Sequence, residues 1–183
     1  MPQEVFTIGH STRTIEEFTA LLHGSGIEVL ADVRTVPRSR HNPQFAEDEL
    51  RSSIPAAGID YERMPGLGGL RYTRKADATG LNDGWRNASF RHYADYMQTG
   101  AFADALAGLV ARVREHTVAI MCAEAVPWRC HRSLIGDALL VRGFAVRDIM
   151  GPTSVKPHTL TRFARVDGLT ITYPSAEPLP GAD

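Results

Sequence analysis

Apolar and polar positions along the chain follow two different periods. Short stretches with the length of β-strands lie at residues 5–9, 29–33, 59–64, 118–121 and 146–150; those at 5–9, 29–33 and 118–121 are mainly apolar, and those at 59–64 and 146–150 mix apolar and charged residues. Between them, apolar residues recur three or four positions apart, which predicts helices at 15–24, 45–54, 90–97, 102–113 and 131–141. This alternation predicts an α/β fold with a mainly parallel sheet flanked by helices.

Local signals mark where several of these elements begin. Thr14 and Glu17 are spaced as a capping box for the first helix, and Ser89 is placed to cap the helix at 90–97. Residues 65–87 form the longest stretch without a period, which is typical of a functional or mobile loop. Within residues 159–174 we expect a short helix and a final strand at 169–173.

The run at residues 118–121 is apolar throughout, which suits a central parallel strand that is buried on both faces. The chain of 183 residues has the length of one domain, and no repeat or linker divides it. We therefore expect a single α/β domain at residues 1–176 and a flexible tail at 177–183.

Composition narrows the function only slightly. The net charge of −1 gives no global field for nucleic acid or an anionic membrane, so such binding would need a local patch. The chain has no signal peptide pattern and no apolar run that could span a membrane. Its two cysteines are too few for a disulfide framework, so we expect a cytoplasmic protein with reduced thiols.

Chemically active side chains follow three of the predicted strands. His10 and Ser11 follow the first strand, Asp32 and Arg34 end the second, and Cys122 and Glu124 end the fourth. In open α/β sheets, ligands bind at the carboxyl ends of the strands. The sequence therefore predicts a ligand site at this rim.

Both cysteines lie in the stretch MCAEAVPWRCHRSLIG, residues 121–136. Cys130, His131 and Arg132 open a predicted helix, whose free N–H groups and dipole favour an anion and lower a thiol pKa. Cys122 or Cys130 would be the nucleophile, and Glu124, His131 or His10 the proton carrier. Arg34 and Arg132 would bind the charge of the substrate, while Arg129 could add fixed charge.

Three other interpretations of these residues stay open. Cys122 could be a small apolar filler of the core, with inert thiols and the arginines in internal salt bridges. A zinc site of Cys122, Cys130, His131 and His10 lacks a recognised ligand spacing, so we predict no metal and no other cofactor. The third interpretation is a nucleic-acid-binding module that uses a basic set of residues: Arg34, Arg38, Arg40, Arg71, Arg74 and Lys75.

The motifs of the chain resemble those of a mainly prokaryotic family catalogued as domain of unknown function number 488. The resemblance runs through TIGHS at 7–11, DVR at 32–34, GIDY at 58–61, LGG at 67–69, MCAE at 121–124, CHR at 130–132 and ITYP at 171–174. It implies an α/β fold in a bacterial protein and no established reaction. Gly68 and Gly69 in this set would let the backbone approach a ligand closely.

A partial similarity to rhodanese sulfurtransferases covers two segments. Residues 30–34 resemble their strand-end Asp-x-Arg motif, and residues 118–150 resemble their order of strand, cysteine, anion loop and helix. The similarity implies that Cys122 would carry a persulfide. Nine residues lie between Cys122 and Arg132, however, where rhodaneses have a much shorter loop.

We therefore predict an enzyme, a cysteine-dependent transferase or hydrolase, that binds a small anionic substrate carrying phosphate, a nucleotide or sulfur. The alternative is the nucleic-acid-binding module with structural cysteines. No membrane partner is expected, and the sequence leaves the substrate and the oligomeric state open. The predicted site consists of His10, Ser11, Asp32, Arg34, Arg38, Gly68, Gly69, Cys122, Glu124, Cys130, His131 and Arg132.

Overall fold

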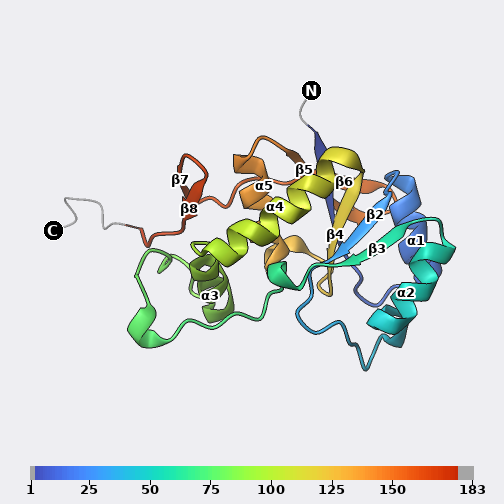
Figure 1. Cartoon of the computed structure of the whole chain (residues 1–183), viewed down its shortest axis with the longest axis horizontal. Coiled ribbons are helices and arrows are strands. Elements are labelled where there is room, and N and C mark those ends of the chain that lie inside the picture. The colour runs from blue at the N-terminus through green and yellow to red at the C-terminus, as the bar shows by residue number, and fades with distance from the viewer. Residues whose placement is uncertain (1–2, 177–183) are drawn as a thin grey trace.

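A six-stranded sheet in the order β3-β2-β4-β1-β5-β6 forms the centre of the molecule (Figure 1). The computed structural model describes residues 3–176. The strands are β1 (Glu4–Gly9), β2 (Val29–Asp32), β3 (Asp60–Arg63), β4 (Val118–Cys122), β5 (Ala145–Gly151) and β6 (Ser154–Pro157). β1 to β5 are mutually parallel and β6 is antiparallel to β5, which confirms the predicted α/β class.

The register brings the carboxyl ends of three strands together. β4 lies between β2 and β1, with Gly9 beside Cys122 and Asp32 beside Met121. Every residue of β4 is buried, as expected of a central parallel strand. The segments that follow β1, β2 and β4 therefore leave the sheet at one rim.

Helices cover both faces of the sheet and form two apolar layers. On one face lie α1 (Ile15–Gly24) and α2 (Glu47–Ala56), which bury Phe18, Leu22, Leu50 and Ile54. The other face is covered by α3 (Ala88–Tyr96), α4 (Gly100–Glu115) and α5 (Arg132–Val141). Figure 1 shows α1 and α2 on the far side of the strands from α3, α4 and α5.

The capping prediction is confirmed at one helix and wrong at another. Thr14 and Glu17 form the capping box of α1. At α3 the N-cap is Asn87, whose side chain accepts hydrogen bonds from the N–H groups of Ser89 and Phe90. Asparagine caps a helix as well as serine does, so α3 begins before Ser89.

The segment at residues 65–87 is irregular apart from two short 3-10 helices, as predicted. The 3-10 helices of the chain are η1 (Pro43–Phe45), η2 (Pro65–Leu67), η3 (Lys75–Asp77) and η4 (Pro127–Arg129). η4 lies between the two cysteines. Proline stands at the first position of η1, η2 and η4, where its missing N–H costs nothing.

The C-terminal part of the chain differs from the prediction. The predicted final strand at 169–173 is confirmed as β8 (Thr170–Thr172), but in place of the short helix there is β7 (Arg165–Asp167), which forms a hairpin with β8 that turns at Gly168 with φ +60°. The edge strand β6 was not predicted either. These strands are short and largely exposed, so they show little apolar alternation. The predicted tail at 177–183 lies outside the described residues.

None of the helices in residues 3–176 is long and apolar enough to cross a membrane.

Candidate functional site

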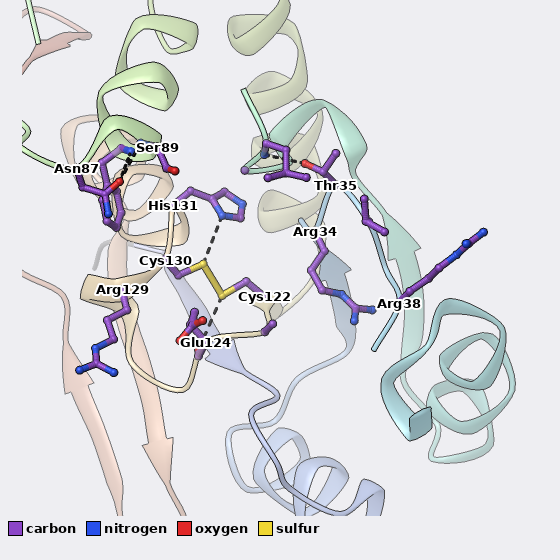
Figure 2. A pocket seen from close by; sticks show the side chains of 15 residues that line it. Arg34, Thr35, Arg38, Asn87, Ser89, Cys122, Glu124, Arg129, Cys130 and His131 are labelled. Carbon is purple, nitrogen blue, oxygen red and sulfur yellow. Dashed lines mark hydrogen bonds between the residues drawn. A yellow bond between two sulfur atoms is a disulfide. The ribbon is translucent and has the colours of Figure 1, made fainter. Parts of the chain in front are cut away.

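A cavity of about 380 Å³ opens at the carboxyl ends of β2 and β4. The loop after β2 forms one wall, and the start of α3 forms another. The segment from Cys122 to His131 contributes the sulfur atoms. The polar lining residues are Arg34, Thr35, Arg38, Asn87, Ser89, Cys122, Glu124, Arg129, Cys130 and His131, and most are labelled in Figure 2.

Cys122 and Cys130 are joined by a disulfide that faces this cavity. Figure 2 shows the sulfur pair with His131 on one side of it and Glu124 on the other. The expectation of two reduced thiols is therefore wrong for this structure. A sequence separation of eight residues did not suggest the pairing, which arises because the loop with η4 folds back and returns Cys130 to the end of β4.

Arg132 contacts the cysteine pair from below the cavity. Its side chain is fully buried, and its Nη1 lies 2.7 Å from the Cys122 Sγ. The same guanidinium donates to the carbonyl oxygens of Glu124, at 2.6 Å, and Ala125, at 3.2 Å. Within residues 3–176 no carboxylate forms an ion pair with Arg132. A buried cation of this kind stabilises negative charge beside it.

A chain of buried polar groups holds Arg132 in place. Its Nε donates to Thr7 Oγ1 at 3.1 Å, and Thr7 donates to Asp148 at 2.5 Å. Burial lowers the pKa of Arg132 to about 10, although the charge of Asp148 opposes this shift. The guanidinium therefore remains charged at neutral pH.

His158 continues this series of hydrogen-bonded groups beyond Asp148. It lies between Asp148 and Asp137, with 3.1 Å from a ring nitrogen to each carboxylate, and Asp137 also accepts from the Tyr173 hydroxyl at 2.9 Å. Burial alone would lower the pKa of His158, but the hydrogen bonds to Asp137 and Asp148 outweigh it and raise the pKa to about 9. His158 is therefore a cation between two carboxylates at neutral pH.

His131 lies next to the second sulfur atom. Its Nε2 is 2.9 Å from the carbonyl oxygen of Val33, and its Nδ1 is 3.4 Å from the Cys130 Sγ. Burial lowers the pKa of His131 to about 4, so the ring is neutral at pH 7. Because a carbonyl oxygen only accepts, Nε2 carries the ring proton and Nδ1 presents a lone pair to Cys130.

Asp32 and Arg34 form a buried pair at the edge of the cavity. Asp32 accepts from Arg34 Nη2 at 2.7 Å and from the Tyr61 hydroxyl at 2.6 Å, and Arg63 lies 3.6 Å away. Arg34 lines the cavity, but its guanidinium is largely engaged by Asp32. Asp32 itself does not line the cavity, so it acts by positioning Arg34.

His10 is buried away from the cavity. Its ring stacks on Phe45 with 4.4 Å between the ring centroids, and its Nδ1 lies 2.8 Å from the Ser11 carbonyl oxygen. Its Nε2 is 3.4 Å from Arg34 Nη1. Burial lowers the pKa of His10 to about 4. These contacts place His10 beneath Arg34 and give it no path to the sulfur atoms.

Two glycines allow the walls of the site to approach each other. A Cβ at Gly9 would lie 1.7 Å from the carbonyl oxygen of Glu124, the same oxygen that accepts from Arg132. A Cβ at Gly69 would lie 2.4 Å from His131 Nδ1. Gly68 packs against Thr35 outside the cavity. Glycine was predicted to let the backbone approach a ligand closely. In this structure Gly68 and Gly69 instead let the backbone approach other protein atoms.

The cavity thus unites about half of the predicted residues. Those that line it are Arg34, Arg38, Gly69, Cys122, Glu124, Cys130 and His131. Arg132 touches Cys122 from beneath, whereas His10, Ser11, Asp32 and Gly68 do not line the cavity. Ser11 instead ties the end of β1 to the loop after β4, through its N–H bond of 2.9 Å to the Ala123 carbonyl oxygen.

Sequence reasoning missed several members of the site. Thr35, Asn87 and Ser89 line the cavity, and Thr7 and Asp148 support Arg132 from neighbouring strands. Among these residues, only Asn87 had a position in the sequence that could have indicated a role in the site, because it ends the long loop at 65–87. Thr7 and Asp148 lie inside apolar runs, where a polar side chain requires a buried partner.

Part of the basic set is engaged within the protein. Arg34 pairs with Asp32, and Arg74 pairs with Asp77 at 2.7 Å. Arg71 lies over the Tyr96 ring, 3.9 Å from its centroid, and donates to two backbone carbonyls. Arg38, Arg40 and Lys75 are exposed. In the described part of the chain no group of three or more His, Cys, Asp or Glu side chains is arranged to hold a metal ion.

A family model matches most of the chain. The model of the family described as "Domain of unknown function DUF488" matches residues 14–139, which include β2, β4 and the start of α5. The chain belongs to the DUF488 family. The match contains both cysteines and Arg132, and leaves β1 and β5 outside it.

No curated protein and no solved structure matches this DUF488 chain. The partial similarity to rhodaneses receives no support from these comparisons. At the position that would carry a persulfide, Cys122 is paired with Cys130 and contacts Arg132.

Proposed function

We propose that this DUF488 protein is a cysteine-dependent enzyme that acts on a small anionic substrate. In its reduced form Cys122 would be the nucleophile, attacking a substrate bound in the cavity between β2, β4 and α3. Glu124, which is exposed at the cavity lining, would exchange protons with the substrate. This proposal assigns no metal or organic cofactor.

The contact between Arg132 and Cys122 carries the proposal. A buried guanidinium that has no carboxylate partner in residues 3–176 is costly, and a thiolate 2.7 Å from it would supply the missing negative charge. A thiolate is also the nucleophilic form of cysteine. The same contact would therefore stabilise the fold and activate the sulfur.

The rest of the cavity favours an anion of modest size. Arg38 and Arg129 are exposed and lie on opposite sides of the sulfur pair (Figure 2), and neither forms an ion pair with any residue of the described range 3–176. Asn87 and Ser89 add neutral polar groups. A volume of about 380 Å³ fits a small molecule and excludes a folded macromolecule.

The nucleic-acid alternative has weaker support. Three of its six basic residues, Arg34, Arg71 and Arg74, are already engaged by protein groups. The remaining three give few phosphate contacts, and the net charge of −1 adds no general attraction. Absence of salt-dependent binding to DNA and RNA would agree with the enzyme proposal.

The experiment compares two alkylating agents on the reduced protein. Iodoacetamide is neutral and iodoacetate is an anion, and digestion with mass measurement assigns the rate to each cysteine. We expect Cys122 to react with iodoacetamide at pH 6 about 10 times faster than Cys130, because a stabilised thiolate persists below the usual thiol pKa. We also expect the ratio of the iodoacetate rate to the iodoacetamide rate to be higher at Cys122 than at Cys130.

Arg129→Gln tests the source of this preference. Loss of one exposed charge should lower the iodoacetate rate at Cys122 by about threefold and leave the iodoacetamide rate unchanged. Arg162→Gln, an exposed arginine that does not line the cavity, is the matched control. The proposal would be overturned if Cys122 is inert. It would also be overturned if the ratio of the iodoacetate rate to the iodoacetamide rate at Cys122 is the same in wild type, Arg129→Gln and Arg162→Gln.

A further inference from the structure

The two cysteines lie on separate segments, Cys122 on β4 and Cys130 between η4 and α5. Cys122 is the last residue of β4, and Cys130 is two positions before the first residue of α5. Their Cα atoms are 7.3 Å apart, slightly more than the roughly 4.4–6.8 Å usual for a bridged pair. Because a pair more than about 7 Å apart is bridged only with backbone movement, this separation favours the open pair of thiols.

The surroundings of the two sulfur atoms differ in charge. The Cys122 Sγ faces the buried guanidinium of Arg132 at 2.7 Å, whereas the Cys130 Sγ faces the neutral ring of His131 at 3.4 Å. After reduction, negative charge is therefore favoured on Cys122, and Cys130 stays protonated with His131 Nδ1 as the acceptor of its S–H. One sulfur is suited to attack first and the other to react second.

We infer that Cys122 and Cys130 form a reversible dithiol–disulfide couple, in which Cys122 attacks a small anionic disulfide and Cys130 resolves the intermediate. This inference rests on the proposed function, because it assigns a reaction to the same cavity and the same nucleophile. It makes the enzyme an oxidoreductase. The reductant that returns the pair to its dithiol form is a small dithiol.

The reaction balances in three steps. The Cys122 thiolate attacks one sulfur of a substrate R–S–S–R, which forms Cys122–S–S–R and releases RS⁻. The Cys130 thiol passes its proton to His131 Nδ1, and the resulting thiolate attacks Cys122 Sγ, which forms the Cys122–Cys130 disulfide and releases the second RS⁻. This RS⁻ takes the proton from His131 and leaves as RSH, so that His131 is neutral again. A dithiol then reduces this disulfide, becomes a cyclic disulfide itself, and restores the protein.

Negative charge that develops on the leaving thiolate would be stabilised by the cavity. Arg38 and Arg129 line the cavity on opposite sides of the sulfur pair, with their guanidinium groups turned outward in Figure 2, and their charges favour a substrate whose thiol product bears carboxylates. His131 is fixed for its role, because Nε2 is hydrogen-bonded to Val33 and Gly69 passes directly over the ring.

Oxidised glutathione, a disulfide that bears carboxylates, is the probe. The reduced wild-type protein should lose the mass of two hydrogen atoms and release two glutathione molecules for each protein, with no lasting adduct. Cys130→Ser should retain one glutathione on Cys122, and Cys122→Ser should react about 10 times more slowly or not at all. His131→Phe should leave adduct formation unchanged and slow the second release about 10-fold.

The outcomes separate this inference from the proposed function. If Cys122 forms the adduct at the expected rate but wild type and Cys130→Ser retain it equally, the couple is overturned and the nucleophile stands. If Cys122 forms no adduct in any of these proteins, both are overturned. Subsequent addition of dithiothreitol must restore both thiols in wild type; a disulfide that resists it would also overturn the couple.

Discussion

At the scale of single residues, the site depends on how buried charges are compensated. Arg132 gives its hydrogen bonds to a sulfur, two carbonyl oxygens and Thr7, and thereby leaves room for a thiolate. Behind it, His158 is held between Asp137 and Asp148. The same network therefore holds Arg132 in position and stabilises the fold electrostatically.

The pH dependence of unfolding should report on His158. Its pKa rises from the ordinary 6.5 to about 9 on folding, so its contribution is fully present below pH 6.5 and is lost as pH rises to about 9. The shift corresponds to about 3 kcal/mol. Urea unfolding of the oxidised protein should show this decline in wild type and in His41→Asn, whose side chain is exposed.

The variant His158→Asn should lose the decline. Its free energy of unfolding is expected to be lower at pH 6.5 and nearly flat up to pH 9. The same slope in His158→Asn and in wild type would show that His158 is not the titrating group.

At the scale of elements, Cys122 and Arg132 are positioned where β1, β4 and α5 meet. The loop after β4 passes so close to the end of β1 that Gly9 has no room for a side chain. The carbonyl that approaches Gly9 belongs to Glu124, which also accepts from Arg132. The position of the loop, and with it that of Cys122, is therefore coupled to the identity of one residue in β1.

Gly9→Ala should displace this loop. We expect the free energy of unfolding to fall by about 1–3 kcal/mol or more, as for other overpacked positions, and the reactivity of Cys122 to fall with it. Gly108→Ala is the matched control, because a Cβ there meets no atom within 4 Å in the middle of α4. That variant should be as stable as wild type or gain about 0.5–1 kcal/mol. Thermal unfolding of both variants measures the difference, and equal stability would contradict the close approach.

At the scale of the whole molecule, periodicity was sufficient for the sheet and its helices. Apolar runs predicted β1 to β5, and the all-apolar run at 118–121 predicted the central strand. The strand predicted at 169–173 is β8, whereas β6 and β7 escaped prediction because they are short and largely exposed. The rule that ligands bind at the carboxyl rim also led to the segments that contain the cavity.

Chain folding outside the regular elements decided the rest of the site. His10 follows a strand as Cys122 does, yet it turns under Arg34 and stacks on Phe45. The pairing of Cys122 with Cys130 depends on the path of η4, which no period encodes. Thr7 and Asp148 are adjacent only because β1 and β5 pair in the sheet. Such contacts between distant segments cannot be read from local pattern.

The ultraviolet absorbance of thiolate tests the central claim most directly. It should be recorded against pH for the reduced proteins Cys130→Ser, Cys122→Ser and Cys130→Ser with Arg132→Met. We predict that Cys130→Ser keeps its thiolate signal well below the ordinary thiol pKa of about 8.5 and that the addition of Arg132→Met removes this advantage. Cys122→Ser should show no such early signal. A thiolate signal in Cys130→Ser that appears only near the ordinary value, with or without Arg132, would contradict the account.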